Sequence, residues 1–356
     1  LDDMLAEQAE YIVCSLENFV NATFTGDEEL IIFINDNDRI LPTATNELKM
    51  SLLTSYSNGE EGDSSAEIIA FDKDSERLFI ANSIANTVDV VDLSDPAAPV
   101  AMMAINFDSV GFMNSIAVYD GIVAVALEAP NAQDPGFITF LDVDGNWLNR
   151  LTVGAMPDMI TFNHAGTQIV VACEGEPNDD YDVDPNGTIA IIDLEEDYTT
   201  LSADNVTILD FMDFNAMEAD LKAAGVRIFG LDATVAQDLE PEYVTILNDD
   251  ATAFVVLQEN NALAKIDLIA KEIIEILPLG TIDHSVYGFG LDASNRTSGI
   301  NIANFPIQGM YMPDAIDQIE ILGQSYLITA NEGDSRDYDG YSEEERVEDL
   351  TLDRFW

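Results

Sequence analysis

Acidic side chains recur at two equivalent places in five related segments of the chain. The first place opens a short apolar stretch and is occupied in turn by Glu67, Ser115, Asp158, Glu242 and Asp314. The second place follows the next apolar stretch and is occupied by Ser83, Glu128, Glu174, Glu259 and Glu332. Carboxylates brought together in this way repel one another unless they bind protons or cations. The pattern therefore predicts a metal site built from carboxylates.

The composition indicates which metal such a site would hold. Oxygen ligands in large number suit Ca²⁺, with Mg²⁺ or Mn²⁺ next. The chain has only two histidines and two cysteines, too few for a histidine-based or cysteine-based transition-metal site or for a disulfide scaffold. The sequence leaves open whether Cys14 and Cys173 form one disulfide bond. The competing interpretation is that the acids cap strand ends facing water. We prefer metal ligation because the acids recur in register.

A second predicted metal site is a short loop of alternating acids. Asp182, Asp184 and Asn186 alternate before Gly187, and Asp193 follows the first of them by eleven residues. This is the spacing of a calcium-binding loop. The flanking residues are typical of strands rather than of the helices that surround such a loop in an EF-hand. We predict a Ca²⁺ site here.

A second dense cluster of acids is the loop that covers residues 331–345 and contains Asp334, Asp337 and Asp339. It is either a further cation site or a solvated surface loop. Arg336 lies within it, and its guanidinium fork matches the oxygen atoms of a phosphate group. We predict Arg336 as a phosphate clamp, with pairing to Asp334 or Asp337 as the alternative.

These residues belong to a diverged repeat. The units cover residues 66–95, 114–146, 157–194 and 241–268, and a fifth begins at 313. In each unit the residue pattern predicts three short strands, and in most units a fourth strand follows. The units repeat at a spacing typical of a β-propeller. We therefore expect an all-β fold of four-stranded blades, about five of them here and about seven in a full ring. The first strand of each blade would line a central channel, where the acids would meet.

Several segments fall outside the repeat. Residues 215–225 predict a helical insert, and residues 283–312 a long loop rich in Gly, Asn and Ser. Residues 48–57 predict an outer strand that closes the ring. Residues 2–19 have helical periodicity. We predict an N-terminal segment, 1–45, outside the repeat, and a propeller over 46–356 that continues beyond the C-terminus of this chain.

The net charge excludes several classes of protein. With 13 Lys+Arg against 68 Asp+Glu, the formal charge is −55, so nucleic acids and anionic membrane surfaces are unsuitable partners. The 47% hydrophobic content excludes a disordered acidic tail. No apolar run reaches the ~18 residues of a transmembrane span. Most of the acids form a solvated coat.

Four sequons, at Asn21, Asn186, Asn205 and Asn295, indicate glycosylation only weakly.

Longer motifs resemble a known family. They are EGEPNDDYDVDPNG, LKAAGVRIFG, VAQDLEPEY, LQENNALA, GLDAS, INIANFPIQGMYMPDAI and TANEGDSRDYDG. In this order they are similar to the choice-of-anchor I propeller family, over residues 48–353. That family includes mesenchyme-specific cell-surface glycoproteins linked to biomineral deposition and atypical alkaline phosphatases. Where family members often read Asn-Glu-Gly-Glu-Pro-Asn, this chain has Cys173 before Glu174. This thiol is either a ligand or a small buried filler.

The resemblance and the acids together imply a secreted or cell-surface calcium-binding propeller. In one hypothesis it is a metal-dependent phosphomonoesterase, whose cations, held by Glu174, Glu242, Glu259 and Glu332, would act on phosphate esters with Arg336 as the clamp. No Ser, Thr or His nucleophile arrangement of recognisable spacing supports this. In the other it is a non-catalytic, calcium-stabilised glycoprotein for adhesion, assembly or mineral binding. A peptide-binding scaffold is a third, generic interpretation.

Overall fold

A computed structural model describes residues 10–15, 29–34, 50–58, 66, 68–296 and 298–351 of the protein. The chain divides into two compact units, Leu1–Ser55 and Tyr56–Trp356. In the first unit, strand β1 (Glu10–Ser15) pairs antiparallel with β2 (Glu29–Ile34). All the other strands belong to the second unit.

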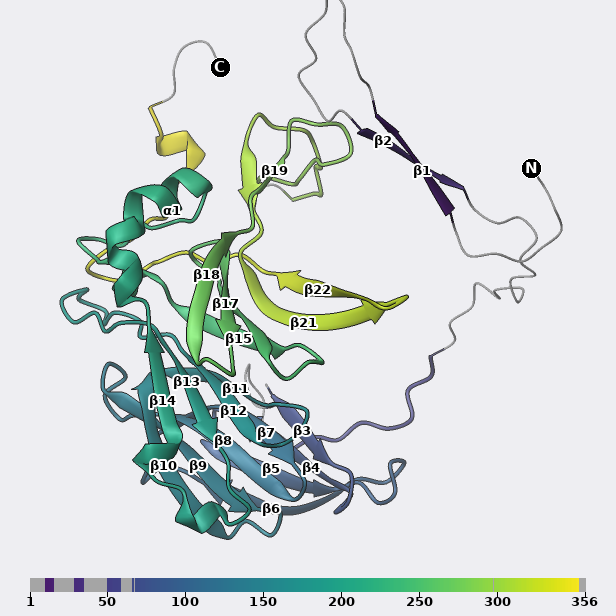
Figure 1. Ribbon diagram of the computed structural model, residues 1–356, viewed down its shortest axis with the longest axis vertical. Coiled ribbons are helices and arrows are strands. Elements are labelled where there is room, and N and C mark those ends of the chain that lie inside the picture. The colour runs from purple at the N-terminus through teal and green to yellow at the C-terminus, as the bar shows by residue number, and fades with distance from the viewer. Residues whose placement is uncertain are drawn as a thin grey trace, which may run out of the picture. The chain divides into compact units, whose positions relative to one another are not determined.

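Four antiparallel sheets of four strands follow one another along the second unit (Figure 1). The first sheet contains β3 (Ile69–Asp72), β4 (Arg77–Asn82), β5 (Thr87–Asp92) and β6 (Val100–Asn106). The second contains β7 (Phe112–Tyr119), β8 (Ile122–Glu128), β9 (Pro135–Asp142) and β10 (Trp147–Ala155). The third contains β11 (Pro157–Phe162), β12 (Gln168–Cys173), β13 (Thr188–Asp193) and β14 (Val206–Asp210). The fourth contains β15 (Pro241–Ile246), β16 (Thr252–Leu257), β17 (Ala262–Asp267) and β18 (Glu272–Pro278).

Two shorter sheets and a few helical turns complete the unit. Strand β19 (Thr281–Asp283) pairs with β20 (Gln308–Met310), and β21 (Pro313–Ile321) pairs with β22 (Gln324–Asn331). The helices are α1 (Glu218–Ala224) and α2 (Val235–Asp238), with 3-10 turns at Tyr198–Thr200, Ala203–Asn205, Met212–Met217 and Val347–Asp349. No helix in the described part of the chain is long and apolar enough to cross a membrane.

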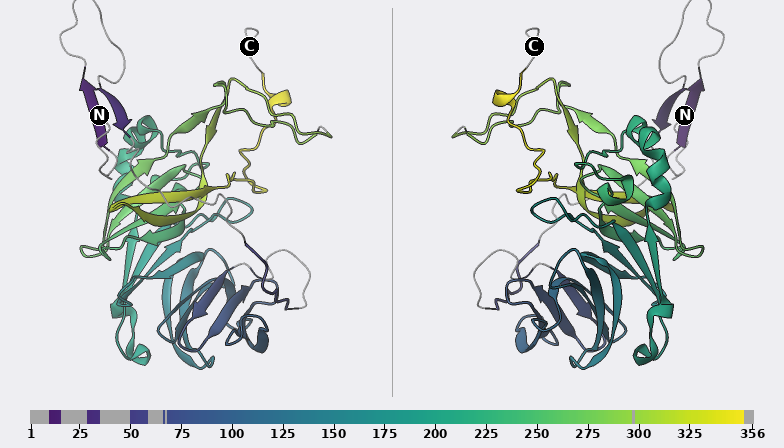
Figure 2. Two further views of the ribbon diagram at one scale, coloured as in Figure 1. Left: turned by 90° about the vertical axis from the view of Figure 1, so that its right-hand side faces the viewer. Right: turned by 90° about the vertical axis from the view of Figure 1, so that its left-hand side faces the viewer.

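The order of strands is that of propeller blades. In each four-stranded sheet the strands pair in chain order, so the first strand is one edge and the fourth is the other. Successive first strands also contact one another: β3 contacts β7, β7 contacts β11, β11 contacts β15, and β15 contacts β21. Figure 2 shows the same sheets in chain order from two sides. The predicted all-β architecture of four-stranded repeats is confirmed, whereas the number of blades in a closed ring stays a prediction.

The core lies between neighbouring sheets. Middle strands such as β8, β12 and β16 are buried along nearly their whole length, because sheets cover both of their faces. One cluster joins the first sheet to the second through Phe79, Val88, Met113 and Val125. Similar clusters join the second sheet to the third and the third to the fourth. These strands are therefore nearly continuous apolar runs, as expected for strands covered on both faces.

Asparagine side chains join each of two sheets to the chain that enters the next one. Asn86 and Asn261 lie in equivalent hairpin turns with φ of 51° and 50°, a left-handed conformation that Asn tolerates. Asn86 Oδ1 accepts a hydrogen bond from Met113 N at 3.0 Å. Asn261 Oδ1 accepts from Tyr311 N at 3.0 Å and from Met312 N at 3.1 Å. Both side chains are buried, so the entering backbone depends on them for its hydrogen bonds.

Two sequence expectations outside the repeat are wrong. Residues 10–15 form strand β1 rather than a helix, because apolar and β-branched residues in Glu10–Ser15 and Glu29–Ile34 pair with one another. The rest of the predicted helix lies outside the described residues. Residues 50–57 form no strand. A strand needs the free edge of another strand to pair with, and the propensity of its own residues does not provide one. The helical insert is confirmed as α1, which ends at Gly225 with φ of 106°.

We expect Asn261→Ala to lower the free energy of unfolding by about 2 kcal/mol or more, because it leaves buried backbone N–H groups without partners. Urea unfolding would measure the loss. Asn261→Gly is the matched control, since glycine adopts the same φ without strain yet also lacks the amide. Wild-type stability of the glycine variant would contradict the hydrogen-bond explanation.

A carboxylate links the third sheet to the fourth. Asp250 accepts hydrogen bonds from His164 N and Ala165 N, each at 2.9 Å, and its Oδ1 lies 2.7 Å from His164 Nδ1. Partial burial acts to raise the pKa of Asp250, but these hydrogen bonds prevail and lower it below its usual value. The ionised carboxylate therefore stabilises the folded protein.

Because that pKa is depressed, the contribution should be fully present above the unfolded pKa of about 4 and should vanish as pH falls through the folded value. We expect Asp250→Asn to be less stable than wild type at pH 7 in urea unfolding, and the difference to shrink below pH ~4. Asp74→Asn removes an exposed turn carboxylate and serves as the control. A difference that is constant with pH would refute the assignment.

Candidate cation site

Antiparallel pairing places the two predicted sets of acids at the same ends of their sheets. Pro157 is opposite Cys173, so Asp158 and Glu174 are neighbours. In the fourth sheet Pro241 is opposite Leu257, which puts Glu242 and Glu259 at one end. Pairing in the β21–β22 hairpin has the same form and places Asp314 and Glu332 together. In these three sheets, the proximity of the first-strand acid to the second-strand acid is thus a consequence of register.

A β-bulge re-aims the first-strand acid in three sheets. The pairing register shifts between Pro157 and Met159, between Pro241 and Val244, and between Pro313 and Ala315. The acids Asp158, Glu242 and Asp314 lie in these bulges. Bulged residues leave the ladder and turn their side chains in new directions. In β7 the bulge falls at Asn114, so Asn114, and not Ser115, is the structural equivalent.

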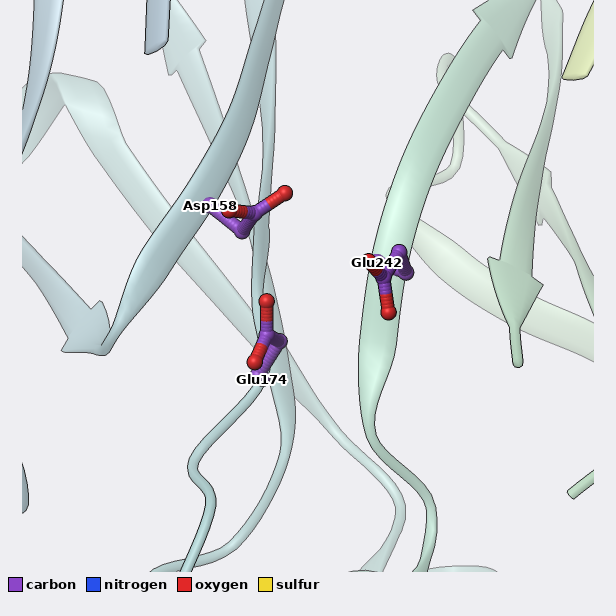
Figure 3. A group of neighbouring side chains, drawn as sticks. All are labelled: Asp158, Glu174 and Glu242. Atoms are coloured by element: carbon purple, nitrogen blue, oxygen red, sulfur yellow. The ribbon is translucent and has the colours of Figure 1, made fainter. Parts of the chain in front are cut away.

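Three carboxylates from two sheets form one compact group. Asp158 of β11, Glu174 after β12 and Glu242 of β15 each offer an oxygen atom, and these atoms all lie within 4.8 Å of one another. Figure 3 shows Asp158 and Glu174 on one side and Glu242 across from them, with the carboxylates facing the space between. Each residue is half-buried. We name these three residues the carboxylate group.

Electrostatics make this group costly without a cation. Burial, followed by the charges of Asp158, Glu176, Glu242 and Glu259, raises the pKa of Glu174 well above its usual value. Burial and then Glu259, Asp158 and Asp314 raise the pKa of Glu242 to about 10. The raised pKa values therefore favour the protonated forms of Glu174 and Glu242 when no cation is bound.

Glu259 adds a fourth carboxylate with an unsatisfied atom. Its residue is 7% exposed, and its Oε2 is buried without a hydrogen-bond partner in the described part of the chain. Its charge acts to raise the pKa of both Glu174 and Glu242. A buried carboxylate oxygen without a partner is unfavourable. A cation beside it would supply the missing interaction.

The remaining predicted acids of the two sets are placed differently. Glu128 is half-buried at the end of β8, where burial raises its pKa and a hydrogen bond from Asn114 opposes the rise. Asp314 is half-buried and influences Glu242. Glu332 is exposed. Glu67 lies outside the described residues.

The predicted calcium loop does not assemble with all four of its residues. Asp193 ends strand β13, whereas Asp182, Asp184 and Asn186 precede its first residue, so roughly 17 Å of strand separates them. Asp193 instead contacts Lys271 and accepts from Gln168 Nε2 at 2.9 Å. Asp182 is exposed and accepts from the Asn178 side chain at 2.8 Å.

Asp184 points inward. Burial raises its pKa to about 6, opposed by Arg336 and supported by Asp238. Its Oδ1 is buried and has no hydrogen-bond partner among the described residues. The side chain thus belongs to the surroundings of Arg336 rather than to a solvent-facing calcium loop.

Arg336 is in the protein interior. It is 2% exposed, and its Nη2 lies 2.8 Å from Glu240 Oε2 while its Nη1 lies 3.2 Å from Asp238 Oδ1. Asp334 and Asp337, the partners considered from the sequence, are exposed. The acidic loop 331–345 therefore directs its acids outward at these positions and its arginine inward.

Sequence reasoning missed Glu176, Asp238, Glu240 and Tyr338. Burial raises the pKa of Glu176, and a hydrogen bond from Tyr338 opposes the rise. A signal was present: Glu174 and Glu176, like Glu240 and Glu242, are separated by one residue. Extended-chain alternation does not place the first pair on one face, because Gly175 between them has a φ of 69°. The two pairs therefore indicate only a high local density of acids.

Cys173 is a free cysteine and completely buried. It packs in the core with Ala126, Ile138 and Val171. Burial raises the pKa of its thiol to about 12. These observations favour the buried-filler interpretation over ligation, because a metal ligand would be the thiolate.

The structure thus defines a domain of propeller-type blades with carboxylates gathered where first strands meet. The profile of the choice-of-anchor I domain matches residues 67–354, and the chain belongs to that family. A comparison with curated proteins finds no match.

Solved structures with similar folds share little sequence with this chain. A functionally unknown protein from Desulfotomaculum acetoxidans DSM 771 has 14% identity and a TM-score of 0.41, over 60% of this chain and 57% of its own. A nidogen/laminin complex chain has 14% identity and a TM-score of 0.36, over 59% of this chain and 62% of its own. The Cps50 (Swd1) β-propeller domain of Myceliophteria thermophila has 9% identity and a TM-score of 0.41, over 72% of this chain and 67% of its own. This chain spans less than two thirds of the first two chains.

The raised pKa of Glu242 predicts that its carboxyl destabilises the cation-free protein above the unfolded pKa of about 4.3, because folding must then take up a proton. In a chelating buffer at pH 7 to 8, we expect Glu242→Gln to be more stable than wild type by about 1 kcal/mol or more, since one pKa unit corresponds to ~1.4 kcal/mol. Urea unfolding would show this gain disappearing below pH ~4. A glutamine variant less stable than wild type under chelation would contradict it.

Proposed function

We propose that this domain binds a hard divalent cation, Ca²⁺ foremost with Mg²⁺ or Mn²⁺ next, in the carboxylate group. The supporting observation is that oxygen atoms of Asp158, Glu174 and Glu242 lie within 4.8 Å of one another. Glu259, a fourth carboxylate, has a buried Oε2 without a hydrogen-bond partner in the described part of the chain. Three or four carboxylates are a ligand set that Ca²⁺ accepts in flexible geometry. The cation replaces the protons that the empty site would hold.

We propose that the role of this binding is structural. A cation here would join the third sheet to the fourth through side chains that otherwise repel each other. A ligand that binds only the folded state, at 100 times its dissociation constant, contributes about 2.7 kcal/mol. The domain would then act as a calcium-stabilised, non-catalytic module of a secreted or surface-attached protein. The choice-of-anchor designation of its family supports that location.

Calcium titration tests this proposal. We expect isothermal titration calorimetry to detect Ca²⁺ binding to the chelator-treated protein, and the melting temperature to rise with Ca²⁺. Glu174→Gln and Glu242→Gln should weaken binding by about tenfold or more, because each removes a charged ligand. Glu332→Gln, which alters an exposed acid, is the control and should bind as wild type does. Absence of binding and of any thermal shift would exclude the proposal.

Metal-dependent phosphomonoester hydrolysis is the second candidate. A cation held by carboxylates is the feature it requires, since such a cation can polarise a phosphoryl group. The burial of Arg336 weighs against it, because the residue is 2% exposed and its guanidinium pairs with Asp238 and Glu240, although Nε and Nη1 have no hydrogen-bond partner in the described part of the chain. Turnover of p-nitrophenyl phosphate that depends on Ca²⁺ and is lost in Glu174→Gln would favour this candidate over the structural role.

A further inference from the structure

Two arginines from distant parts of the chain lie against one aromatic ring. The guanidinium carbon of Arg227 is 3.9 Å from the centroid of the Phe229 ring, and that of Arg336 is 4.7 Å from it. Arg227 belongs to the insert that precedes β15, and Arg336 to the acidic loop that follows β22. Neither arginine belongs to the carboxylate group, so cation binding does not by itself explain why both are held against this ring.

Arg336 contacts the segment that leads into β15. Its two terminal nitrogens approach Glu240 and Asp238, and Nη2 also donates to the Asp238 carbonyl oxygen at 2.9 Å. Glu240 precedes Glu242 by two residues, and Pro241 between them begins the strand. Fixing Glu240 therefore fixes the start of the strand that presents Glu242.

The same contacts reach the turn that presents Glu259. Asn260 Nδ2 donates to the Asp238 carbonyl oxygen at 2.7 Å, and the Glu240 N–H donates to Asn260 Oδ1 at 3.3 Å. Asn260 follows Glu259 directly and is fully buried. The segment held by Arg336 thus also holds the β16–β17 turn.

Arg227 and Glu343 close this arrangement. Arg227 Nη1 donates to the Glu259 carbonyl oxygen at 2.7 Å, and its Nη2 lies 2.5 Å from Glu343 Oε2. Glu343 in turn accepts from Arg336 N at 3.1 Å and donates its own N–H to Arg336 O at 2.9 Å. The backbone around Glu259 is consequently fixed from two sides by groups anchored in the acidic loop.

We propose that Arg336 is a positioning residue of the cation site, which holds the start of β15 and the β16–β17 turn so that Glu242 and Glu259 face the same cation. This inference rests on the proposed cation binding. A planar fork with several fixed donors can contact Asp238 and Glu240 together, which a lysine ammonium on a flexible stem does less well. Groups that orient metal ligands typically change metal affinity about 10- to 100-fold when they are replaced.

Terbium luminescence measures the predicted effect directly. Tb³⁺ is a hard cation that accepts the same oxygen ligands, and its excited-state lifetimes in H₂O and D₂O give the number of water molecules bound to it. We expect Arg336→Lys and Arg336→Met to weaken binding of Ca²⁺ and Tb³⁺ by about tenfold or more and to add water to bound Tb³⁺. Glu259→Gln should have the same two effects. Arg77→Met is the matched control, because it removes a partly buried arginine that pairs with Asp144.

A double-mutant cycle separates positioning from general destabilisation. If Arg336 acts through Glu259, Arg336→Lys combined with Glu259→Gln should bind the cation no more weakly than the weaker single variant. A role in stability alone would lower the melting temperature, as we expect for Arg77→Met, and leave the number of bound waters unchanged.

The outcomes distinguish the two proposals. Wild-type protein that binds neither Ca²⁺ nor Tb³⁺ would remove the proposed function. Wild-type binding together with unchanged affinity and hydration in folded Arg336→Lys would overturn the positioning role and leave cation binding intact. Arg336→Lys keeps the positive charge, so it decides the question if Arg336→Met does not fold.

Discussion

The register of antiparallel strands is the constraint on which the site depends. Because the start of each first strand lies opposite the end of the second, any acid at either place has the other as a neighbour. Bulges at Asp158 and Glu242 then turn those side chains out of the ladder, and contact between β11 and β15 brings the two sheets together. Repulsion among the resulting carboxylates is a consequence of the fold, and it is this repulsion that a cation would relieve.

The protein manages its buried negative charge in two ways. Asp238 and Glu240 are paired with Arg336, which is nearly inaccessible to solvent. Asp158, Glu174 and Glu242 form a separate group, and only Glu242 is close in sequence to Asp238 and Glu240. A buried arginine satisfies two acids with fixed geometry, whereas a carboxylate group suits an exchangeable ion. The division explains why the same short motif, Glu240-Pro241-Glu242, supplies one acid to each arrangement.

Neighbouring sheets are also joined by polar side chains that accept hydrogen bonds from backbone N–H groups. Asn86 and Asn261 bond the backbone that enters the next sheet, and Asp250 bonds the turn at His164. These polar contacts complement apolar cores that lie between every pair of four-stranded sheets. Membership in the choice-of-anchor I family is consistent with this build, and the cation site would add one further link between the third sheet and the fourth.

The sequence by itself determined the repeated strands, the helical insert and the two places where acids recur, because strand periodicity and turn residues are local properties. It also pointed to Asp158, Glu174, Glu242 and Glu259. Only tertiary structure decided that Asp193 lies at the far end of its strand, that Glu332 faces solvent, and that Arg336 is buried against acids about a hundred residues away. Bulge positions, partner edges and burial depend on contacts between distant segments, which no local pattern encodes.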